Sequence, residues 1–440
     1  MLIDDSSVSA PRRRADGAFP VALVATLAVA VALVFLQFVA TRSGFEGPLQ
    51  SLTRDFVGTP KSMSVPWAAL ALGLVGLINR QRLIAVAVAV GIDVVVLGAR
   101  LLGGAPVAVG NGPTWVLLGI AAVAAVRWTG DLRRSALLGA GLGAMLAVAI
   151  KIGDVWLQIT VMTRPAVLDQ YVELADRAFG RPSWMMGQVV DALGPAGYGV
   201  LHWVYIQLPV AAIAVALYQL RNGWPSHHLV RTFLAIGMIG PLFYLVFPVV
   251  GPDFAFGGEG NGAQLGDFWP TLLPTGTDPA SFVFDSPAPR NCMPSLHTAW
   301  ALAIFVHTRR GPFWLRWGGT AWLVCTLAAT LGFGYHYGVD LVAGVVLSLT
   351  IESGLRDPER GWDRSRIRLV CSGTAAFVAL LTGYRYLAGP IAAVPLLSVP
   401  VILGMMLAVV VGFHATFFAA PESTLGRLAG RGPEDEFARM

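Results

Sequence analysis

The chain has 440 residues, of which 55% are hydrophobic and only 13% are charged. Soluble domains average about 25% charged residues, so the composition excludes an ordinary soluble domain and indicates a polytopic membrane protein. The formal net charge of +5 does not indicate a nucleic-acid partner. The basic residues are nearly all arginines in short loops, where such residues set the orientation of membrane helices.

Twelve apolar stretches follow one another along the chain, and each is a candidate membrane helix. The first follows Arg12 to Arg14 and, at about 22 residues, is longer than the apolar part of a cleaved signal peptide. We therefore expect it to be retained, and we predict an all-α fold with about twelve transmembrane helices. The stretches are residues 19–40, 64–79, 83–99, 113–127, 135–160, 198–220, 232–250, 294–308, 314–333, 336–354, 367–387 and 391–418.

The charges of the loops predict the orientation. Arginines cluster in alternate loops, although Arg42, Arg54 and Lys61 blur the pattern in the first intervening loop. Loop 251–293 carries five acidic residues and Arg290 as its only basic residue. Excess Lys and Arg marks the cytoplasmic side, so we expect both termini inside and this loop outside. The frequent Ala, Gly, Val and Arg favour a bacterial cell membrane as the location.

Two of the expected outer segments are long. Residues 161–197 mix polar and apolar side chains and are expected to include an interfacial amphipathic helix. Residues 251–293 are rich in Gly, Pro and Asp, and a loop of this length is usually a lid, a binding loop or disordered. Because the second segment leads directly to a histidine motif, we expect it to be a lid that covers the site.

The segment Gly334 to Asp340 reads Gly-Tyr-His-Tyr-Gly-Val-Asp and opens the tenth apolar stretch. His336 and Asp340 are four residues apart, which places them on one face of a helix. A carboxylate in that position can accept a hydrogen bond from one ring nitrogen and leave the other as a nucleophile or base. Taken alone, this motif is equally compatible with a structural His–Asp pair.

The segment Pro289 to Trp300 opens the eighth stretch and contains Pro294-Ser-Leu-His297. Proline suits the first turn of a helix, and Ser295 can cap the free amides there, which form an anion site. In that turn His297 can donate a proton to a leaving oxygen. The alternative is a histidine at the membrane interface without a chemical role.

Together, the two motifs predict one site that contains both histidines. One helical hairpin separates His297 from His336, so the two can be neighbours in space. Ionisable residues in membrane helices are functional hypotheses by default. A nucleophile, an orienting acid, a proton donor and anion-binding amides together specify acyl or phosphoryl transfer. The sequence shows no carboxylate cluster of metal-ligand type, so we expect a covalent histidine mechanism with no metal and no cofactor.

The pair of motifs, Pro294 to His297 followed by His336 to Asp340, resembles the second and third signature motifs of the type 2 phosphatidic acid phosphatase superfamily. The resemblance is closest to the branch with inositol phosphorylceramide synthase and sphingomyelin synthase. It implies that His336 is the nucleophile, that Asp340 orients it, and that His297 is the general acid and base.

The resemblance also implies a division of the chain. It covers roughly residues 135–355, which we expect to form a catalytic six-helix core like that of the phosphatidic acid phosphatases. Residues 1–134 would then be an N-terminal membrane extension of about four helices. Residues 356–440 would be two C-terminal helices and a cytoplasmic tail.

The sequence departs from the family where cations are expected. The phosphatase branch has a Ser-Arg pair where this chain has Ala329-Thr330, and its first motif, a lysine followed by Arg-Pro, is replaced by Phe247-Pro-Val-Val-Gly-Pro-Asp253. The cations that would stabilise the phosphoryl group are therefore missing at these positions.

Other residues are candidates to replace them. Arg290 is the first candidate, although an arginine at the rim of the site is at least as good an interpretation. Lys151, one turn before Asp154, is the second, with a structural ion pair as its alternative. Ser295 and Tyr335 complete the expected phosphate- and substrate-binding set.

The expected function is transfer of a phosphoryl-linked head group from a lipid donor at the outer face, through a phosphohistidine intermediate. The resemblance implies phosphatidylinositol as donor and hence inositol phosphate as head group. One alternative is a lipid phosphate phosphatase with water as acceptor. Another is a lipid transporter or scramblase, although transporters usually show repeats and interrupted helices. The expected partners are a lipid phosphate substrate and the membrane, and the oligomeric state is left open.

Overall fold

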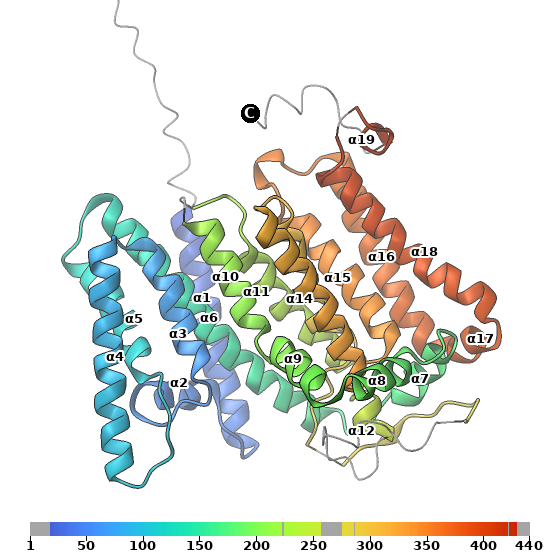
Figure 1. The fold of residues 1–440 in the computed structure, drawn as a ribbon, viewed down its shortest axis with the longest axis horizontal. Coiled ribbons are helices and arrows are strands. Elements are labelled where there is room, and N and C mark those ends of the chain that lie inside the picture. Colours follow the sequence, from blue (N-terminus) through green and yellow to red (C-terminus); the bar gives the residue numbers. More distant parts are fainter. Residues whose placement is uncertain (1–17, 222–223, 257–274, 286, 421, 429–440) are drawn as a thin grey trace, which may run out of the picture.

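The computed structural model describes residues 18–221, 224–256, 275–285, 287–420 and 422–428. Most of these residues are helical, which confirms the expected all-α membrane fold (Figure 1). The strands in this part of the chain are β1 (Ala166–Val167) and β2 (Phe282–Val283), which pair antiparallel and join the two long segments 161–197 and 251–293.

The N-terminal helices form a bundle of their own. They are α1 (Ala18–Arg42), α2 (Pro48–Val57), α3 (Ser64–Gly73) with the 3-10 turn η1 (Leu74–Gly76), α4 (Asn79–Leu102), α5 (Asn111–Val126) and α6 (Gly130–Thr163). Small buried side chains such as Ala69, Ala89 and Ala140 let α3 to α6 pack closely. Helix α6 also packs against the next part of the fold, where the indole N–H of Trp156 donates to the carbonyl oxygen of Pro241.

The remaining helices carry the motifs. They are α7 (Asp169–Arg177), α8 (Pro182–Ala192), α9 (Gly194–Ile206), α10 (Leu208–Leu220), α11 (Leu229–Val246), α12 (Pro252–Phe256), α13 (Leu296–Thr308), α14 (Phe313–Gly332), α15 (Gly338–Leu355), η3 (Pro358–Arg360), α16 (Arg364–Tyr386), α17 (Ala388–Ala393), α18 (Pro395–Phe417) and α19 (Thr424–Leu428).

Each of the twelve apolar stretches coincides with a helix or with a pair of consecutive helices. Within the described ranges, α4, α6, α11, α15, α16 and α18 are long and apolar enough to cross a membrane, and α9 with α10 would be a seventh span bent by 56°. By length and composition the count is thus six or seven, below the twelve that we expected. The other stretches are shorter or more polar helices, although α1 and α14 run between the same two ends of the molecule (Figure 1).

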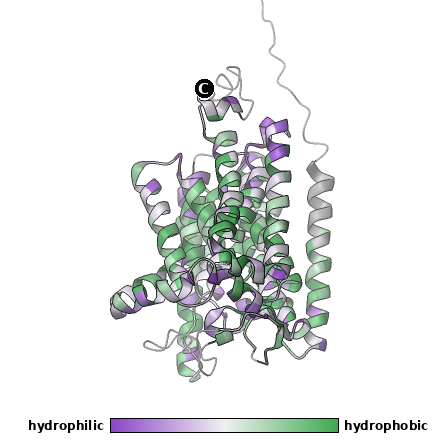
Figure 2. Ribbon diagram, turned by 90° about the vertical axis from the view of Figure 1, so that its right-hand side faces the viewer, coloured by the Kyte–Doolittle hydropathy of each residue, from purple (hydrophilic) through white to green (hydrophobic). Residues whose placement is uncertain are grey.

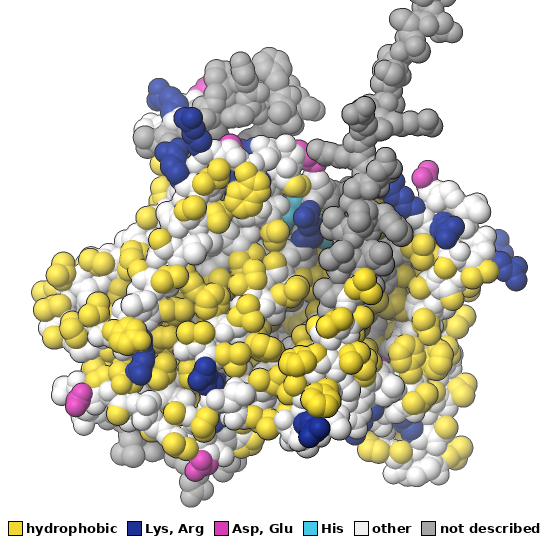
Figure 3. Space-filling model, turned by 180° about the vertical axis from the view of Figure 1, so that it is seen from behind, with side chains coloured by type: hydrophobic (Ala, Val, Ile, Leu, Met, Phe, Trp, Pro, Cys, Tyr) yellow, Lys and Arg dark blue, Asp and Glu magenta, His cyan; other side chains and the backbone are white. Residues whose placement is uncertain are grey.

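The two ends of the bundle differ. Helices α7, α8, α12 and α17 lie at the lower end in Figure 1, whereas α19 and the start of α1 lie at the upper end. Along the helices hydrophobic residues predominate, and polar residues gather toward the two ends (Figure 2). Viewed from behind, hydrophobic side chains cover the middle of the molecule and most charged side chains lie toward its upper and lower edges (Figure 3). This is the pattern of a protein embedded in a bilayer.

The largest buried cluster lies in the second part of the fold. It combines side chains of α10, α11, α13 and α15 with those of the C-terminal helices α16 and α18, for example Ile236, Ala299, Val346, Phe377 and Phe413. The two C-terminal helices therefore share one core with the helices that carry the histidine motifs.

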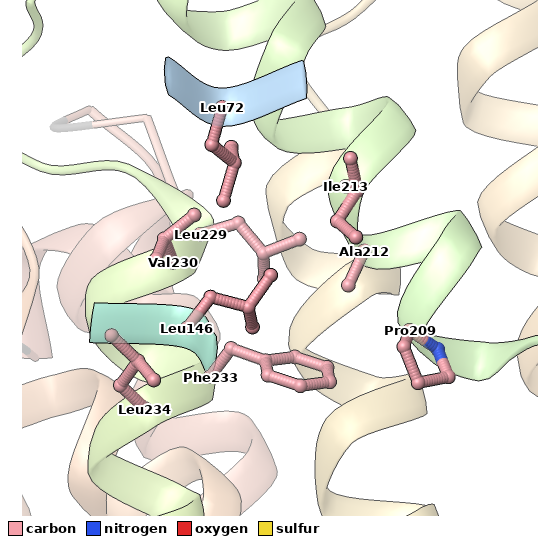
Figure 4. A pocket seen from close by; sticks show the side chains of 9 residues that line it. All are labelled: Leu72, Leu146, Pro209, Ala212, Ile213, Leu229, Val230, Phe233 and Leu234. Atoms are coloured by element: carbon pink, nitrogen blue, oxygen red, sulfur yellow. The ribbon is translucent and has the colours of Figure 1, made fainter. Parts of the chain in front are cut away.

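An apolar crevice lies where the N-terminal bundle meets α10 and α11 (Figure 4). Its nine lining side chains, including Leu72, Leu146 and Phe233, carry no side-chain polar group, and no predicted site residue is among them. We assign the crevice no chemical role.

Candidate active site

The second motif begins in the turn between α14 and α15. Gly334 has a φ of +65°, which L-residues with a side chain rarely adopt, and the chain turns there toward His336. Oδ2 of Asp340 accepts from the backbone N–H of Tyr337 at 2.8 Å, so this carboxylate caps the start of α15. His336 thus precedes the helix by two residues, instead of lying within it as the four-residue spacing predicts.

His336 and Asp340 are in contact despite this difference. Nδ1 of His336 lies 3.4 Å from Oδ2 of Asp340, and both side chains are buried. This distance is longer than an ordinary hydrogen bond. The carboxylate faces Nδ1, so Nε2 is the ring nitrogen that remains for chemistry.

Cys292, which the sequence analysis assigned no chemical role, also contacts this carboxylate. Its Sγ lies 2.6 Å from Oδ2 of Asp340 and 3.3 Å from the carbonyl oxygen of Tyr335. Burial, with a smaller contribution from Asp340, raises the pKa of the Cys292 thiol well above its ordinary value, which favours a protonated thiol that donates. Since ligand atoms of Cys292, His336 and Asp340 lie within 4.8 Å of one another, the same geometry could hold a metal ion, and the metal-free mechanism stays a prediction.

The first motif forms the start of α13. Oγ of Ser295 accepts from the backbone N–H of Thr298 at 3.4 Å, so Ser295 is the N-cap of the helix. His297 is half-buried in the first turn. Nδ1 of His297 lies 3.1 Å from the hydroxyl of Tyr205, and the two rings stack at 4.0 Å. Tyr205, on α9, therefore fixes the orientation of His297.

The two motifs meet because α13 and α15 approach closely at this end. The backbone N–H of Ser295 donates to the carbonyl oxygen of Asp340 at 3.2 Å. A Cβ at Gly344 would lie 2.5 Å from the carbonyl oxygen of Ser295, so this approach requires glycine. The ring centroids of His297 and His336 are 6.4 Å apart, close enough for one substrate to contact both.

The other predicted binding residues are distributed differently. Tyr335 is half-buried, and its ring centroid lies 5.4 Å from that of Tyr205, the residue that stacks on His297. Arg290 is buried, and its guanidinium donates to the backbone carbonyls of Arg164, Ala288 and Phe284. In this arrangement Arg290 joins the segment 161–197 to the segment 251–293.

Lys151 has a different partner from the one expected. Its Nζ lies 2.8 Å from Oδ2 of Asp55 on α2, and both side chains are buried, whereas the sequence suggested Asp154. Removing one member of such a pair costs about 3–5 kcal/mol of stability. The pair fastens α2 to α6 inside the N-terminal bundle, which makes a structural role the better interpretation.

Two further arginines, Arg177 and Arg181, lie just before the residue of α8 that contacts the second motif. Oγ of Ser183, at the start of α8, donates to the carbonyl oxygen of His336. Arg181 stands two residues earlier, with its Nε 3.0 Å from Glu173, which also pairs with Arg177 at 2.7 Å. The Arg181-Pro182 pair is the sequence signal that could have indicated this segment. The resemblance predicts an Arg-Pro pair, but it places that pair at residues 247–253.

A second cluster of ionisable groups joins the C-terminal ends of α13 and α15 to the loop before α11. Nε2 of His227 and of His307 each lie 3.1 Å from the Glu352 carboxylate. The amide oxygen of Gln219 accepts from the backbone N–H of Leu229 at 2.8 Å, so its NH2 group must face Nδ1 of His307, 2.9 Å away. His307 therefore carries its proton on Nε2 and donates it to Glu352. This proton argues for a hydrogen-bonded hub and against a metal site.

Comparisons with known proteins agree with the division of the fold. Residues 20–159 match a family model described as a domain of unknown function (DUF5933), and residues 185–352 match one described as the PAP2 superfamily. No curated protein and no solved structure matches the chain. The first match includes most of α6, which we expected to open the catalytic core.

The second match runs from α8 to α15 and contains His297, His336 and Asp340. The PAP2 superfamily is a helical membrane fold, and its members are phosphatases and phosphotransferases, so the match supports a lipid phosphatase or phosphotransferase type of activity. It carries no support for the inositol phosphorylceramide synthase branch. The chain is thus an integral membrane protein whose residues 185–352 resemble the PAP2 superfamily.

Proposed function

We propose that the protein is a membrane enzyme that transfers a phosphoryl-linked group from a lipid donor through a phosphohistidine intermediate. The observation that carries the proposal is the contact of Nδ1 of His336 with the buried Asp340 carboxylate, with His297 facing it 6.4 Å away. This is a nucleophile with an orienting acid on one side and a proton donor on the other.

In the first step, Nε2 of His336 attacks the phosphorus of the donor. A bond from nitrogen to phosphorus forms, the bond to the leaving oxygen breaks, and His297 gives that oxygen a proton. Tyr205 holds Nδ1 of His297, so the proton leaves from Nε2. The positive charge that develops on His336 lies against the Asp340 carboxylate.

In the second step, His297 is neutral and takes the proton of the incoming hydroxyl. The acceptor oxygen attacks phosphorus, the bond to nitrogen breaks, and His336 leaves as the neutral imidazole. The two histidines thus return to their starting protonation states, and the net reaction exchanges one alcohol or water for another at phosphorus.

We assign the stabilisation of the phosphoryl charge to Arg181 and to the first amides of α13. The hydrogen bond from Ser183 to the carbonyl oxygen of His336 brings the Arg181 segment against the loop that carries the nucleophile. The 13-residue helix α13 contributes its N-terminal partial positive charge.

A lipid or glycan hydroxyl is the proposed acceptor, and inositol phosphate is the head group that the resemblance suggests. The positions where the phosphatase branch has a Ser-Arg pair hold Ala329 and Thr330, both fully buried within α14, with the Thr330 hydroxyl donating to the carbonyl oxygen of Thr326. These positions offer no cation to an aqueous phosphatase site. A lipid phosphate phosphatase remains the second candidate because the same two steps operate with water.

We further propose that the site faces the outside of the cell. The arginine-bearing connections after α10, α13 and α15 lie at the upper end in Figure 1, and the α12 segment next to the site lies at the lower end. The positive-inside rule then makes the upper end cytoplasmic.

Purified protein incubated with labelled lipid donors tests the function. Wild type should transfer the label to an alcohol acceptor, should release phosphate more slowly, and should carry an acid-labile, base-stable label on histidine. His336→Ala should lose both turnover and label, whereas His414→Ala, an exposed histidine on α18, should retain them. Equal turnover by wild type and His336→Ala would contradict the proposal.

A further inference from the structure

Helix α7 buries three acidic side chains, of which Glu173 pairs with Arg177 and Arg181, whereas Asp169 and Asp176 have other partners. Asp169 and Asp176 are seven residues apart, so they lie on the same face, two turns from each other. Both side chains are completely buried. Acidic side chains are almost never fully buried unless they are paired, so their partners decide what they do.

Asp169 binds two separate segments at once. Its Oδ2 accepts from the backbone N–H of Val250 at 3.1 Å, and its Oδ1 accepts from the backbone N–H of Gly251 and the hydroxyl of Tyr337, both at 2.9 Å. Tyr337 is the residue that follows His336. The carboxylate therefore ties the segment after α11 to the loop of the proposed nucleophile.

Asp176 binds the next residues of the same loop. Its Oδ1 accepts from the backbone N–H of Val339 at 3.1 Å and also interacts with the backbone of Gly338. These are the first two residues of α15, immediately before Asp340. A carboxylate at this end of a helix is favourable because of the partial positive charge there. The two acids of α7 thus hold the chain on both sides of the His336 turn.

The outer side of α7 is fixed as well. It packs against α17, and the Arg385 guanidinium of α16 lies 4.0 Å from the ring centroid of Tyr171. The side-chain oxygen of Gln170 accepts from the backbone N–H of Ala280 at 2.9 Å, which joins the long loop to the same helix. The C-terminal helices therefore support α7 from behind.

We propose that Asp169 and Asp176 are positioning residues of the phosphoryl-transfer site, and that α7, supported by α16 and α17, holds His336 against Asp340. The inference rests on the proposed function and deepens it. It assigns to the C-terminal helices a part in the site that lies outside the matched residues 185–352.

The electrostatics of α7 make the idea testable by pH. Burial raises the pKa of Asp169 to about 7 and that of Asp176 well above its ordinary value. The charged or titratable groups that face Asp169 are Tyr337 and Asp340 of the motif and Arg290 of the long loop. The ionised carboxylate accepts all three hydrogen bonds, so protonation as the pH falls through about 7 weakens the contact with the loop.

Asp169→Asn and Asp176→Asn test the proposal, with Asp191→Asn, an exposed aspartate on α8, as the matched control. A displacement of reacting groups by about 1 Å costs about 100-fold in rate, so we expect kcat to fall by about 10- to 100-fold with little change in KM. The kcat of the wild type should fall between pH 8 and pH 6 as Asp169 becomes protonated, and Asp169→Asn should make this fall smaller. Tyr337→Phe removes one contact of Asp169, so the double variant Asp169→Asn/Tyr337→Phe should have a kcat close to that of Asp169→Asn alone.

A second readout is independent of turnover. Cys292 is only 1% exposed and contacts Asp340, so its alkylation by a maleimide reports loosening of the loop in a Cys325→Ala/Cys371→Ala background. Both Asn variants should label faster than Asp191→Asn at an unchanged melting temperature. Unchanged labelling and kcat would overturn the positioning role, as would faster labelling that merely follows a lower melting temperature. If the Asn variants label faster at an unchanged melting temperature but turnover does not depend on His336, the proposed function is wrong. The role of α7 in holding the loop would still stand.

Discussion

Oδ2 of Asp340 faces both Nδ1 of His336, at 3.4 Å, and the thiol of Cys292, at 2.6 Å. Only the imidazole belongs to the proposed chemistry, so the two neighbours should respond differently to mutation. Asp340→Asn should lower kcat by about 10³- to 10⁴-fold, because an amide can stabilise the wrong tautomer of the histidine. Cys292→Ala should stay within about tenfold of wild type. Steady-state kinetics at a saturating donor concentration measures both, and a larger effect of Cys292→Ala would place the thiol in the reaction.

Chelation separates the covalent histidine mechanism from a metal-dependent one. Because Cys292, His336 and Asp340 could hold a metal ion, dialysis against EDTA and 1,10-phenanthroline is informative. We expect full turnover after dialysis, and no gain on adding zinc. Loss of activity that zinc restores would show that these residues are ligands.

The general acid is tested through the leaving group. His297→Gln should lower kcat by about 10²- to 10⁴-fold with a natural lipid donor. The loss should shrink strongly with a nitrophenyl phosphodiester, whose leaving oxygen needs no proton. Tyr205→Phe removes the hydroxyl beside Nδ1 and should reproduce a smaller part of the same pattern. An equal loss with both donors would assign His297 to substrate binding.

Arg181 is the proposed phosphoryl-binding cation, and Arg290 is its matched comparison. Arg181→Gln should weaken inhibition by vanadate and lower kcat by about 10²- to 10³-fold, as the loss of a group that stabilises transition-state charge does. Arg290→Gln should mainly lower the melting temperature, since its guanidinium donates to carbonyls that join the outer segments. The opposite result, with vanadate affinity lost only in Arg290→Gln, would restore Arg290 as the phosphate ligand.

The orientation is tested with introduced cysteines. Native Cys292 is too buried to report accessibility, so single cysteines at the exposed positions Asp278 and Arg310 are better probes in a cysteine-free background. A membrane-impermeant maleimide should label Asp278→Cys in intact cells and Arg310→Cys only after permeabilisation. The reverse pattern would place the site in the cytoplasm.

The sequence predicted the helices because apolar periodicity and length depend on local composition. It also predicted that His297 and His336 would meet, since one hairpin separates them. It could not predict the Cys292 or Tyr205 contacts, which join residues far apart in the chain. It assigned Lys151 to Asp154 because the two are one turn apart, whereas α2 brings Asp55 closer.

The two long segments 161–197 and 251–293 were the hardest part to predict. Their amphipathic character predicted a surface helix, but Asp169 and Asp176 face inward, because only the folded loop supplies the amides that satisfy them. The role of Arg181 was missed for the same reason. A cation on an irregular segment has no periodicity that would indicate which surface it meets.

The hub around Glu352 has a mechanical consequence. Glu352 of α15 is joined to His307 of α13 near one end, while Ser295 is joined to Asp340 at the other. The two contacts, at Asp340 and Glu352, are about 18 Å apart along α15. They hold α13 and α15 together at both ends. The two contacts therefore hold His297, at the start of α13, in register with Asp340, at the start of α15.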